Sequence, residues 1–195
     1  MNIYRQKLLN AVLFFAKRIR RLNTTKLAKL LYNLDFKHFQ QTGYPSIGLL
    51  YYAYKQGPLP IDFWKELVSE QPHEDLSDLI NIIEEHFDDG SEGFERRIIA
   101  KPKTQFDDSL FTPREMDILN ELVEVYKDYD AVMYSEASHE LGSPWDKTRK
   151  SKGDNELIDY MLAIDDKAEV SMDDALEGLK EYFSLLYNFR IEPVK

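Results

Sequence analysis

Cysteine is absent from the 195-residue chain, which excludes disulfides, thiolate zinc sites, cysteine-ligated clusters and thiol catalysis. Long apolar runs are absent as well, because the best candidate, residues 8–16, is too short to cross a bilayer and is followed by a basic cluster. The N-terminus also lacks a small-residue cleavage site after an apolar core. The sequence therefore predicts a cytoplasmic protein without a membrane span.

Recognisable catalytic motifs are missing too. The chain has no glycine-rich phosphate loop, no G-x-S-x-G nucleophile elbow and no H-E-x-x-H metal motif. The four histidines are scattered, and none has a second histidine three or four residues away on the same helical face. Glu84, Glu85 and His86 lie in an acidic run and are interpreted as a solvated surface rather than a metal site. We therefore expect no enzymatic activity, no metal and no cofactor.

Acidic residues are almost absent from residues 1–55, where ten lysines and arginines accompany a single acid, Asp35. The rest of the chain carries fifteen basic and 34 acidic residues, so the net charge of -10 hides a strong asymmetry. Such asymmetry indicates a polyanion contact at the basic end, two oppositely charged faces that attract different partners, or simply solvated surfaces. The sequence leaves these three interpretations open.

The composition is that of a globular protein, with 43% hydrophobic residues, twelve tyrosines and eleven phenylalanines. Apolar residues recur with helical spacing from the start of the chain, which predicts a helix over residues 3–21. Its apolar stripe consists of Leu8, Val12, Phe15, Ile19 and Leu22. A second helix is expected between an N-cap near Asn23 and a stop at Gly43, and the aromatic run of residues 49–55 is typical of a strand.

Further helices are expected downstream, and the clearest begins with a capping box at Thr112 and runs to Tyr129. The other predicted helices span residues 61–70, 76–87, 131–141, 154–164 and 171–189, the last of them striped by Met172, Leu176, Leu179, Phe183 and Leu186. Residues 96–106 predict at best an edge strand or half of an irregular hairpin, and residues 145–155 predict a loop. The sequence thus predicts one compact, mainly α domain with a short β element and two extra C-terminal helices.

Two N-terminal helices joined by a tight turn, with basic side chains between Arg5 and Lys29, superficially fit a helix-turn-helix. Thr24, Thr25 and Lys26 could supply the exposed polar side chains that a recognition helix needs, but the following residues are apolar. The acidic remainder would also repel phosphate at long range. A DNA-binding regulator is therefore kept only as the alternative function, and DNA is a disfavoured partner.

The aromatic run is a candidate partner surface, because tyrosine combines a large contact area with a polar tip. In a strand, Tyr52 and Tyr54 share one face. Tyr51 and Lys55 share the other face, and alternation alone does not say which face is core. Trp145 is either a hydrophobic clamp at a helix end or an exposed anchor for a partner.

Several short motifs occur in a fixed order along the chain: Lys26-Leu27-Ala28-Lys29-Leu30-Leu31-Tyr32, Gly43, Tyr52-Ala53-Tyr54-Lys55-Gln56-Gly57-Pro58, Ser138-His139 and Trp145. This ordered set resembles the Panacea domain, also called the SocA-like antitoxin family, and it is more specific than any of its pieces. The resemblance covers roughly residues 8–147. Residues 1–147 are accordingly predicted to form the Panacea domain, and residues 148–195 to form a helical extension packed on it.

The resemblance implies a protein that works by binding. Family members are antitoxins of bacterial and phage toxin–antitoxin pairs, and related sequences are also described as phage-associated proteins. The implied partner is a cognate toxin, which the antitoxin neutralises by direct complex formation. In one described type the antitoxin also hands its toxin to a protease, so a protease is a further implied partner.

Within this resemblance, the candidate partner-binding residues are Tyr51, Lys55, His139 and Trp145. For His139 the alternative is an interior, hydrogen-bonded histidine. The expected structural members of the motif are Leu30, Leu31 and Tyr32, while Gly57 and Pro58 are expected to shape the turn after the strand.

Residues 66–95 contain eleven acids and no lysine or arginine. Because many toxins that act on RNA need a basic surface, we hypothesise that this acidic segment meets the toxin. The residues expected to make this contact are Glu84, Glu85, Asp88 and Asp89. Complementary charge would raise the association rate and suppress binding to wrong partners.

Overall fold

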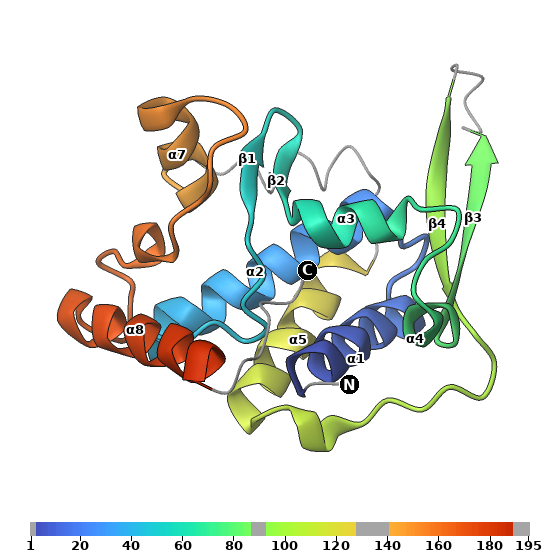
Figure 1. The fold of residues 1–195 in the computed structure, drawn as a ribbon, viewed down its shortest axis with the longest axis horizontal. Helices are drawn as coiled ribbons and strands as arrows, with labels where there is room; N and C mark the ends of the chain where they lie inside the picture. The colour runs from blue at the N-terminus through green and yellow to red at the C-terminus, as the bar shows by residue number, and fades with distance from the viewer. Residues whose placement is uncertain (1–2, 87–92, 128–140, 189–195) are drawn as a thin grey trace.

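The computed structural model describes residues 3–86, 93–127 and 141–188. Helices dominate, and two small antiparallel hairpins lie at separate places on the helical body (Figure 1). In chain order the elements are α1 (Ile3–Arg18), α2 (Thr24–Thr42), β1 (Tyr52–Tyr54), β2 (Gly57–Leu59), α3 (Ile61–Leu67), α4 (Glu74–Ser77), β3 (Ile80–His86), β4 (Phe94–Ala100), the 3-10 turn η1 (Asp108–Leu110), α5 (Pro113–Tyr126), α7 (Pro144–Lys152), the 3-10 turn η2 (Tyr160–Ala163) and α8 (Met172–Asn188). The fold is mainly α with a minor β component, as predicted, and the two hairpins mean that it is not all-α.

Helices α1 and α2 occupy the centre of the molecule, with α5 beside them (Figure 1). The stripe predicted for the first helix is buried throughout, since each of its residues is at most 5% exposed. Asn23 caps α2, because its Oδ1 accepts a hydrogen bond from the Lys26 N–H at 2.8 Å. Gly43 ends α2 in the left-handed region, with φ at +78°, and its N–H donates to Phe39 O. Both predicted ends of the second helix are therefore confirmed.

The aromatic run forms strand β1, as predicted, and pairs antiparallel with β2. Residues 154–164 do not form the predicted helix, because their backbone runs alongside β1 instead. Ala53 N–H donates to Glu156 O at 2.8 Å, and Ile158 N–H donates to Tyr51 O at 2.9 Å. Within the range of the predicted helix, the one helical element is the 3-10 turn η2. The structure of residues 154–164 is thus determined by hydrogen bonds to β1, about 100 residues earlier. The sequence pattern of residues 154–164 alone does not reveal that interaction.

A hairpin of β3 and β4 replaces most of the helix predicted over residues 76–87. Its register places Ile82 opposite Ile98, and β-branched residues pack well in such cross-strand pairs. Strand β4 is tied to the body because Ile98 N–H donates to Leu22 O at 2.8 Å. The strand expected within residues 96–106 is thus present as part of β4, and its pairing with β3 overrides the helical periodicity of the preceding segment.

The capping box at the start of α5 is present as predicted. Thr112 Oγ1 accepts from the Glu115 N–H at 3.3 Å, and the Glu115 carboxylate accepts from the Thr112 N–H at 2.8 Å. This reciprocal pair satisfies two amides that have no partner within the helix. The helix predicted over residues 131–141 lies almost entirely outside the described residues.

Helix α7 occupies residues that were predicted to form a loop. Ser143 caps it by accepting from the Asp146 N–H, and Pro144 stands in the first turn. Asp146 and Lys150 form an ion pair at 2.7 Å with the favourable i, i+4 spacing. The prediction of a loop is therefore wrong. Helix α7 has no regular apolar stripe, and the local signals for it are the Ser143 cap, Pro144 and the i, i+4 charge pair.

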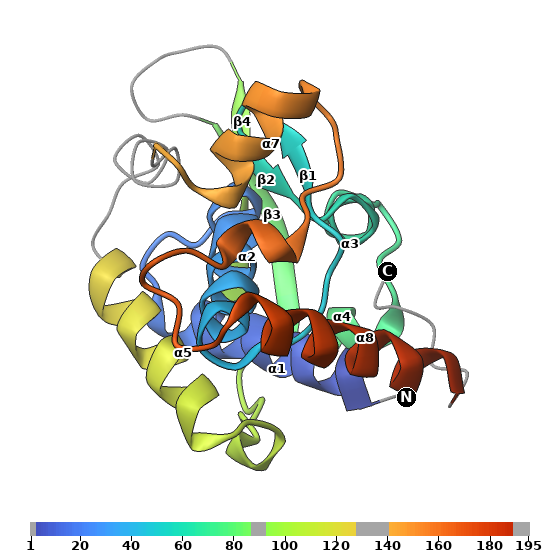
Figure 2. The same ribbon diagram turned by 90° about the vertical axis from the view of Figure 1, so that its left-hand side faces the viewer.

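Helix α8 lies across one side of the body (Figure 2). Its buried face includes the small residues Ala175 and Gly178. A Cβ atom at Gly178 would lie only 2.7 Å from Gly43 O, so the two backbones are in direct contact. Tyr182 packs over Gly48, and its hydroxyl donates to Ile47 O at 2.9 Å. The helix itself was predicted correctly over nearly its whole length.

The stripe predicted for α8 is only partly buried: Leu186 is buried and Leu179 packs half-buried against the core, whereas Met172, Leu176 and Phe183 are exposed. The buried residues are Ala175, Gly178, Tyr182 and Leu186. The predicted positions lie one residue later, which rotates them by about 100° around the helix. The rotation arises because small residues let α8 approach α2 more closely than leucine or phenylalanine would allow.

Replacing Gly178 by valine is expected to loosen α8. The added atoms have no room against Gly43 O, and overpacking of this kind costs about 1–3 kcal/mol. Hydrogen exchange of the α8 amides measures the effect, and faster exchange is expected there than in α1. Glu177→Val introduces the same residue at an exposed position of α8 and serves as the control. Equal exchange in both variants would contradict the close packing.

Candidate partner-binding surface

The predicted contact residues Tyr51 and Trp145 lie in the core rather than on the surface. Tyr51 is 1% exposed, and its hydroxyl donates to Asp35 Oδ2 at 2.9 Å. Trp145 is 5% exposed, and its Nε1–H donates to Tyr54 O at 2.9 Å. The core is therefore the correct interpretation for both aromatic side chains in this structure.

The other predicted contact residues lie at different places on the molecule. Lys55 is exposed at the turn between β1 and β2. Three residues, His139, Asp88 and Asp89, lie outside the described residues. Glu84 and Glu85 lie on β3, where they form ion pairs across the hairpin: Glu84–Arg96 and Glu85–Arg97, each at 2.8 Å. The fold thus brings Lys55 to one hairpin and Glu84 and Glu85 to the other.

The motif residues are structural, as expected. Leu30 and Leu31 are completely buried in α2. The Tyr32 hydroxyl accepts a hydrogen bond from the Trp145 N–H at 3.2 Å, which ties α2 to α7. Gly57 and Pro58 begin β2, and Gly57 has a φ of +131° that favours glycine. These parts of the motif therefore help to hold α2, α7 and the hairpin of β1 and β2 together.

Long-range ion pairs join the basic N-terminal segment to the acidic remainder. The Arg5 guanidinium binds Glu66 at 2.6 Å and Asp75 at 2.8 Å. Further pairs of this kind among the described residues include Lys7–Glu115, Arg21–Glu95 and Lys37–Glu121. Because Arg5, Lys7, Arg21 and Lys37 each pair with acids of the remainder within one body, this finding disfavours the interpretation as two oppositely charged faces.

The same pairing bears on a possible metal site. Ligand atoms of Glu66, His73 and Asp75 lie within 4.8 Å of one another. However, the Arg5 guanidinium already donates to both carboxylates and holds the pKa of the Asp75 carboxyl below its usual value. Arg5 therefore supplies the positive charge that a cation would bring, and we assign no metal to this group.

The start of α2 does not present the surface of a DNA-recognition helix. Asn23, Thr24 and Lys26 are each at most 6% exposed, and Thr25 is the exposed residue of that turn. A recognition helix inserts the side chains of its N-terminal turn into the major groove, which requires them to be exposed. The arrangement therefore disfavours the helix-turn-helix alternative.

Asp35 is the centre of a buried polar network that the sequence analysis missed. Its carboxylate is completely buried and accepts from three consecutive backbone N–H groups, those of residues 47–49, at 2.6, 3.0 and 3.2 Å. The hydroxyls of Tyr51 and Tyr160 lie 2.9 and 3.3 Å from its Oδ2. The loop after α2 is thereby folded around one carboxylate. The available signal was a single acid between apolar residues in an otherwise basic and apolar segment.

The electrostatics of Asp35 identify it as a structural residue. Burial raises the pKa of its carboxyl, while hydrogen bonds from the backbone and from Tyr51 act in the opposite direction. The Tyr160 hydroxyl also donates to Leu49 O at 2.7 Å, so its oxygen can accept a hydrogen bond from a protonated Asp35. These side chains are at most 5% exposed, which leaves a substrate no access to the network.

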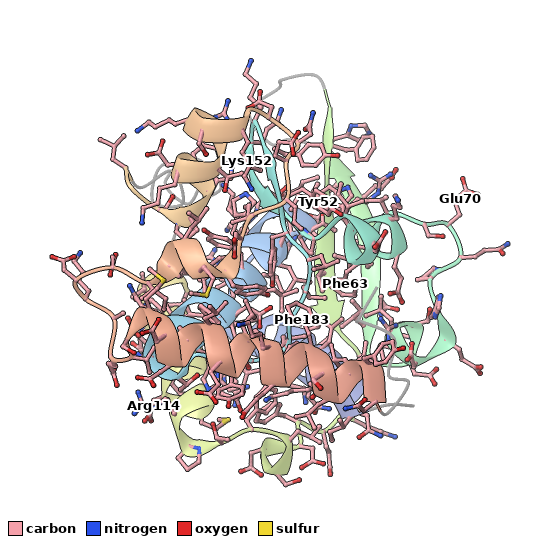
Figure 3. The ribbon with its side chains drawn as sticks, turned by 60° about the vertical axis from the view of Figure 1, so that its left-hand side comes forward. Tyr52, Phe63, Glu70, Arg114, Lys152 and Phe183 are labelled. Carbon is pink, nitrogen blue, oxygen red and sulfur yellow. The ribbon has the colours of Figure 1, made fainter. Side chains whose placement is uncertain are left out.

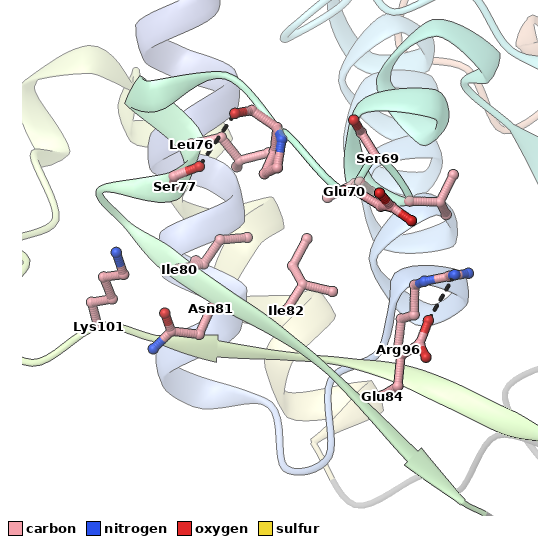
Figure 4. Close-up of a pocket in the computed structure, with 13 residues that line it drawn as sticks. Ser69, Glu70, Leu76, Ser77, Ile80, Asn81, Ile82, Glu84, Arg96 and Lys101 are labelled. Carbon is pink, nitrogen blue, oxygen red and sulfur yellow. Dashed lines mark hydrogen bonds and ion pairs between the residues drawn. The ribbon is translucent and has the colours of Figure 1, made fainter.

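A groove of about 480 Å³ opens between residues 67–77 and the second hairpin, which consists of β3 and β4. Ile80 and Ile82 point into it from β3, on the side of Leu76 (Figure 4). Charged side chains also contribute to its lining, namely Glu70, Glu84, Arg96 and Lys101. An apolar floor with a charged border can bury apolar side chains of a partner and orient its charges.

A smaller pocket of about 190 Å³ lies against the family motif, between α2, the first hairpin and α3. Lys29, Tyr54 and Trp64 contribute to its lining. Lys29 is only 2% exposed, and burial lowers the pKa of its amino group to about 8. Lys26 and Lys29 of the motif are therefore part of the interior, which explains why they do not form a basic surface.

The fold defines a mainly α protein with two β hairpins and a buried acidic centre. The family model described as antitoxin SocA-like, Panacea domain, matches residues 27–146, and the chain belongs to this family. No curated protein and no solved structure matches the chain. The matched range includes both hairpins, Asp35 and the groove, whereas η2 and α8 lie beyond it. Among the described helices, none combines the length and the apolar character needed to cross a bilayer.

Proposed function

We propose that this protein is an antitoxin that neutralises a cognate toxin by direct protein–protein binding, without enzymatic activity of its own. The observation that carries the proposal is its membership of the SocA-like antitoxin, Panacea domain family over residues 27–146. The burial of the Asp35 network supports a binding role, because its titratable groups are inaccessible to a substrate and serve the fold.

The groove and the acids around it are the toxin-binding surface in this proposal. Glu70, Glu74 and Asp78 are exposed, and within the described parts of the chain none of them forms an ion pair. Figure 3 shows Glu70 at the outer edge of the molecule. These acids are better candidates than Glu84 and Glu85, whose charges are already compensated by arginines. They would meet a basic surface on the toxin.

The proposal is tested by capturing partners of the tagged chain from its native host and identifying them by mass spectrometry. The captured candidate is then expressed with and without this protein. Growth arrest by the candidate alone, and its relief by a stable complex, is the expected result. The half-life of the toxin distinguishes neutralisation by binding from delivery to a protease. Absence of a toxic partner would contradict the proposal, and salt-sensitive recovery of DNA would support the regulator instead.

The triple variant Glu70→Gln, Glu74→Gln, Asp78→Asn is expected to slow association with the captured toxin by about three- to tenfold at low salt. The expected cause is lost electrostatic steering, so the difference shrinks as salt is raised. Surface plasmon resonance at several salt concentrations measures the association rate.

A matched control removes three other exposed acids through Asp117→Asn, Glu156→Gln and Asp166→Asn, which changes the net charge by the same amount. These residues lie on α5 and in the segment around η2, away from the groove lining. Equal association rates for the two triple variants would show that total charge matters and that the acids near the groove do not.

A further inference from the structure

Helix α8 leaves an apolar stripe exposed beside its buried face. The stripe consists of Met172, Leu176, Leu179, Phe183 and Tyr187, which follow one another at intervals of four, three, four and four residues. That spacing places them on one side of the helix. Leu179 is partly buried, whereas the exposures of the others run from 40% for Leu176 to 85% for Tyr187. We call this set the α8 stripe.

The α8 stripe is not a random scatter of surface residues. The face that α8 turns to the body carries Ala175 and Gly178, while the larger Leu176 and Phe183 are 40% and 41% exposed beside it. Single exposed apolar residues are normal on protein surfaces, but a continuous row on one helix marks an interaction surface. A row with this spacing is the pattern by which helices recognise one another.

Charge selects the kind of partner. Helix α8 contains four acids and one base: Asp173, Asp174, Glu177, Glu181 and Lys180. Asp173, Glu177 and Lys180 lie one residue after Met172, Leu176 and Leu179, so two acids and one base border the α8 stripe on the side away from the buried face. A second copy of α8 would bring the same excess of acids to the contact, which is unfavourable. A helix with lysine or arginine beside its apolar face would place opposite charges there instead.

We propose that the α8 stripe binds an amphipathic helix of a partner protein that carries apolar side chains on one face and basic residues along its border. This surface is separate from the groove at the second hairpin, which lies on the other side of the molecule (Figure 1). It also lies beyond the residues that match the family model. The proposal does not depend on the identity of the toxin or on the proposed antitoxin function.

The test uses the full chain and two synthetic helical peptides, each of three heptads with leucine at positions a and d. One peptide carries lysine and the other glutamate at the flanking positions. Fluorescence anisotropy measures the dissociation constants. The lysine peptide is expected to bind the full chain at least tenfold more tightly than the glutamate peptide. Absence of binding by the lysine peptide, or equal binding of the two peptides, would overturn the proposal.

Two variants locate the contact. Leu176→Ser with Phe183→Ser is expected to weaken binding of the lysine peptide at least tenfold. Asp173→Lys with Glu177→Lys keeps the apolar residues and is expected to reverse the preference toward the glutamate peptide. Because these four side chains lie on the exposed side of α8, both variants should stay folded with a melting temperature close to that of the unmodified chain. If the serine variant proves unstable, the charge-reversal variant still tests the proposal through its preference between the two peptides.

The matched control is Leu185→Ser with Val125→Ser, which alters two apolar residues that are 47% and 46% exposed outside the α8 stripe. It is expected to bind the lysine peptide as the unmodified chain does. Equal loss in the control and in the Leu176→Ser, Phe183→Ser variant would overturn the proposal. So would a dimer in analytical ultracentrifugation that only the stripe variant abolishes, because the occupant would then be a second copy of the chain.

Discussion

Replacing Asp35 by alanine is expected to lower the free energy of unfolding by about 3–5 kcal/mol, because the carboxylate is the shared acceptor of a buried network. The substitution leaves the backbone N–H groups of residues 47–49 and the Tyr51 hydroxyl without their acceptor. A domain of ordinary stability unfolds with about 5–15 kcal/mol, so the variant should be only marginally folded. Urea unfolding followed by circular dichroism measures the loss.

Two further variants make the Asp35 experiment specific. Tyr160→Phe removes one hydroxyl from the same network and is expected to cost about 1 kcal/mol. Asp117→Ala removes an exposed acid and is expected to change stability by less than about 0.5 kcal/mol. If Asp35→Ala cost no more than Asp117→Ala, the loop after α2 would not depend on the carboxylate.

The Asp35 network also shows how the C-terminal segment joins the rest of the fold. The Tyr160 hydroxyl donates to Leu49 O at 2.7 Å, and the Tyr182 hydroxyl donates to Ile47 O at 2.9 Å. Both tyrosines lie beyond the residues that match the family model, yet each is only 5% exposed. Residues of η2 and α8 therefore complete the same core as the loop around Asp35.

The sequence predicted those elements whose signals are local. The buried stripe of α1, the Asn23 and Gly43 ends of α2, and the Thr112 capping box of α5 all depend on residues within one or two turns. Strand β3 was mistaken for a helix because its isoleucines also fit a helical period. Its pairing with β4, which decides the structure, involves residues beyond the segment itself.

Exposure of the candidate site residues was harder to predict than secondary structure. Tyr51 and Trp145 are suited to interfaces by chemistry, but the fold uses their polar groups for internal hydrogen bonds. Glu84 and Glu85 form part of an acidic run, yet the arginines that pair with them stand twelve residues later on β4. Charge counted along a sequence therefore overstates the charge that a surface displays.

Glu115 provides the second large prediction, since its carboxylate is 1% exposed and forms an ion pair with Lys7. It also accepts from Ser46 Oγ and from the Thr112 N–H, both at 2.8 Å. Burial acts to raise the pKa of the Glu115 carboxyl, but the Lys7 charge and these hydrogen bonds outweigh it, and the pKa lies below its usual value. Glu115→Ala is expected to cost about 3 kcal/mol at pH 7, measured by urea unfolding.

The depressed pKa of Glu115 fixes the direction of the pH dependence. The carboxylate contributes its full stability above the unfolded pKa of about 4.3, and the contribution is lost as pH falls through the lower folded pKa. The difference between the unmodified chain and Glu115→Ala should therefore be largest near neutral pH and shrink toward pH 3.

A separate comparison removes the contribution of His38, whose Nε2 lies 3.9 Å from the Glu115 carboxylate. Burial lowers the pKa of His38, so its neutral form stabilises the fold above the unfolded pKa of about 6.5 and this contribution is lost as pH falls below that value. The pH dependence of unfolding is therefore also compared between His38→Gln and His38→Gln with Glu115→Ala. The difference between these two variants reports the Glu115 contribution without that of His38.

Glu121→Gln, which breaks an exposed pair with Lys37, serves as a control and should cost less than about 1 kcal/mol at every pH. Parallel pH profiles for Glu115→Ala and the unmodified chain would mean that folding does not lower the pKa of the Glu115 carboxyl.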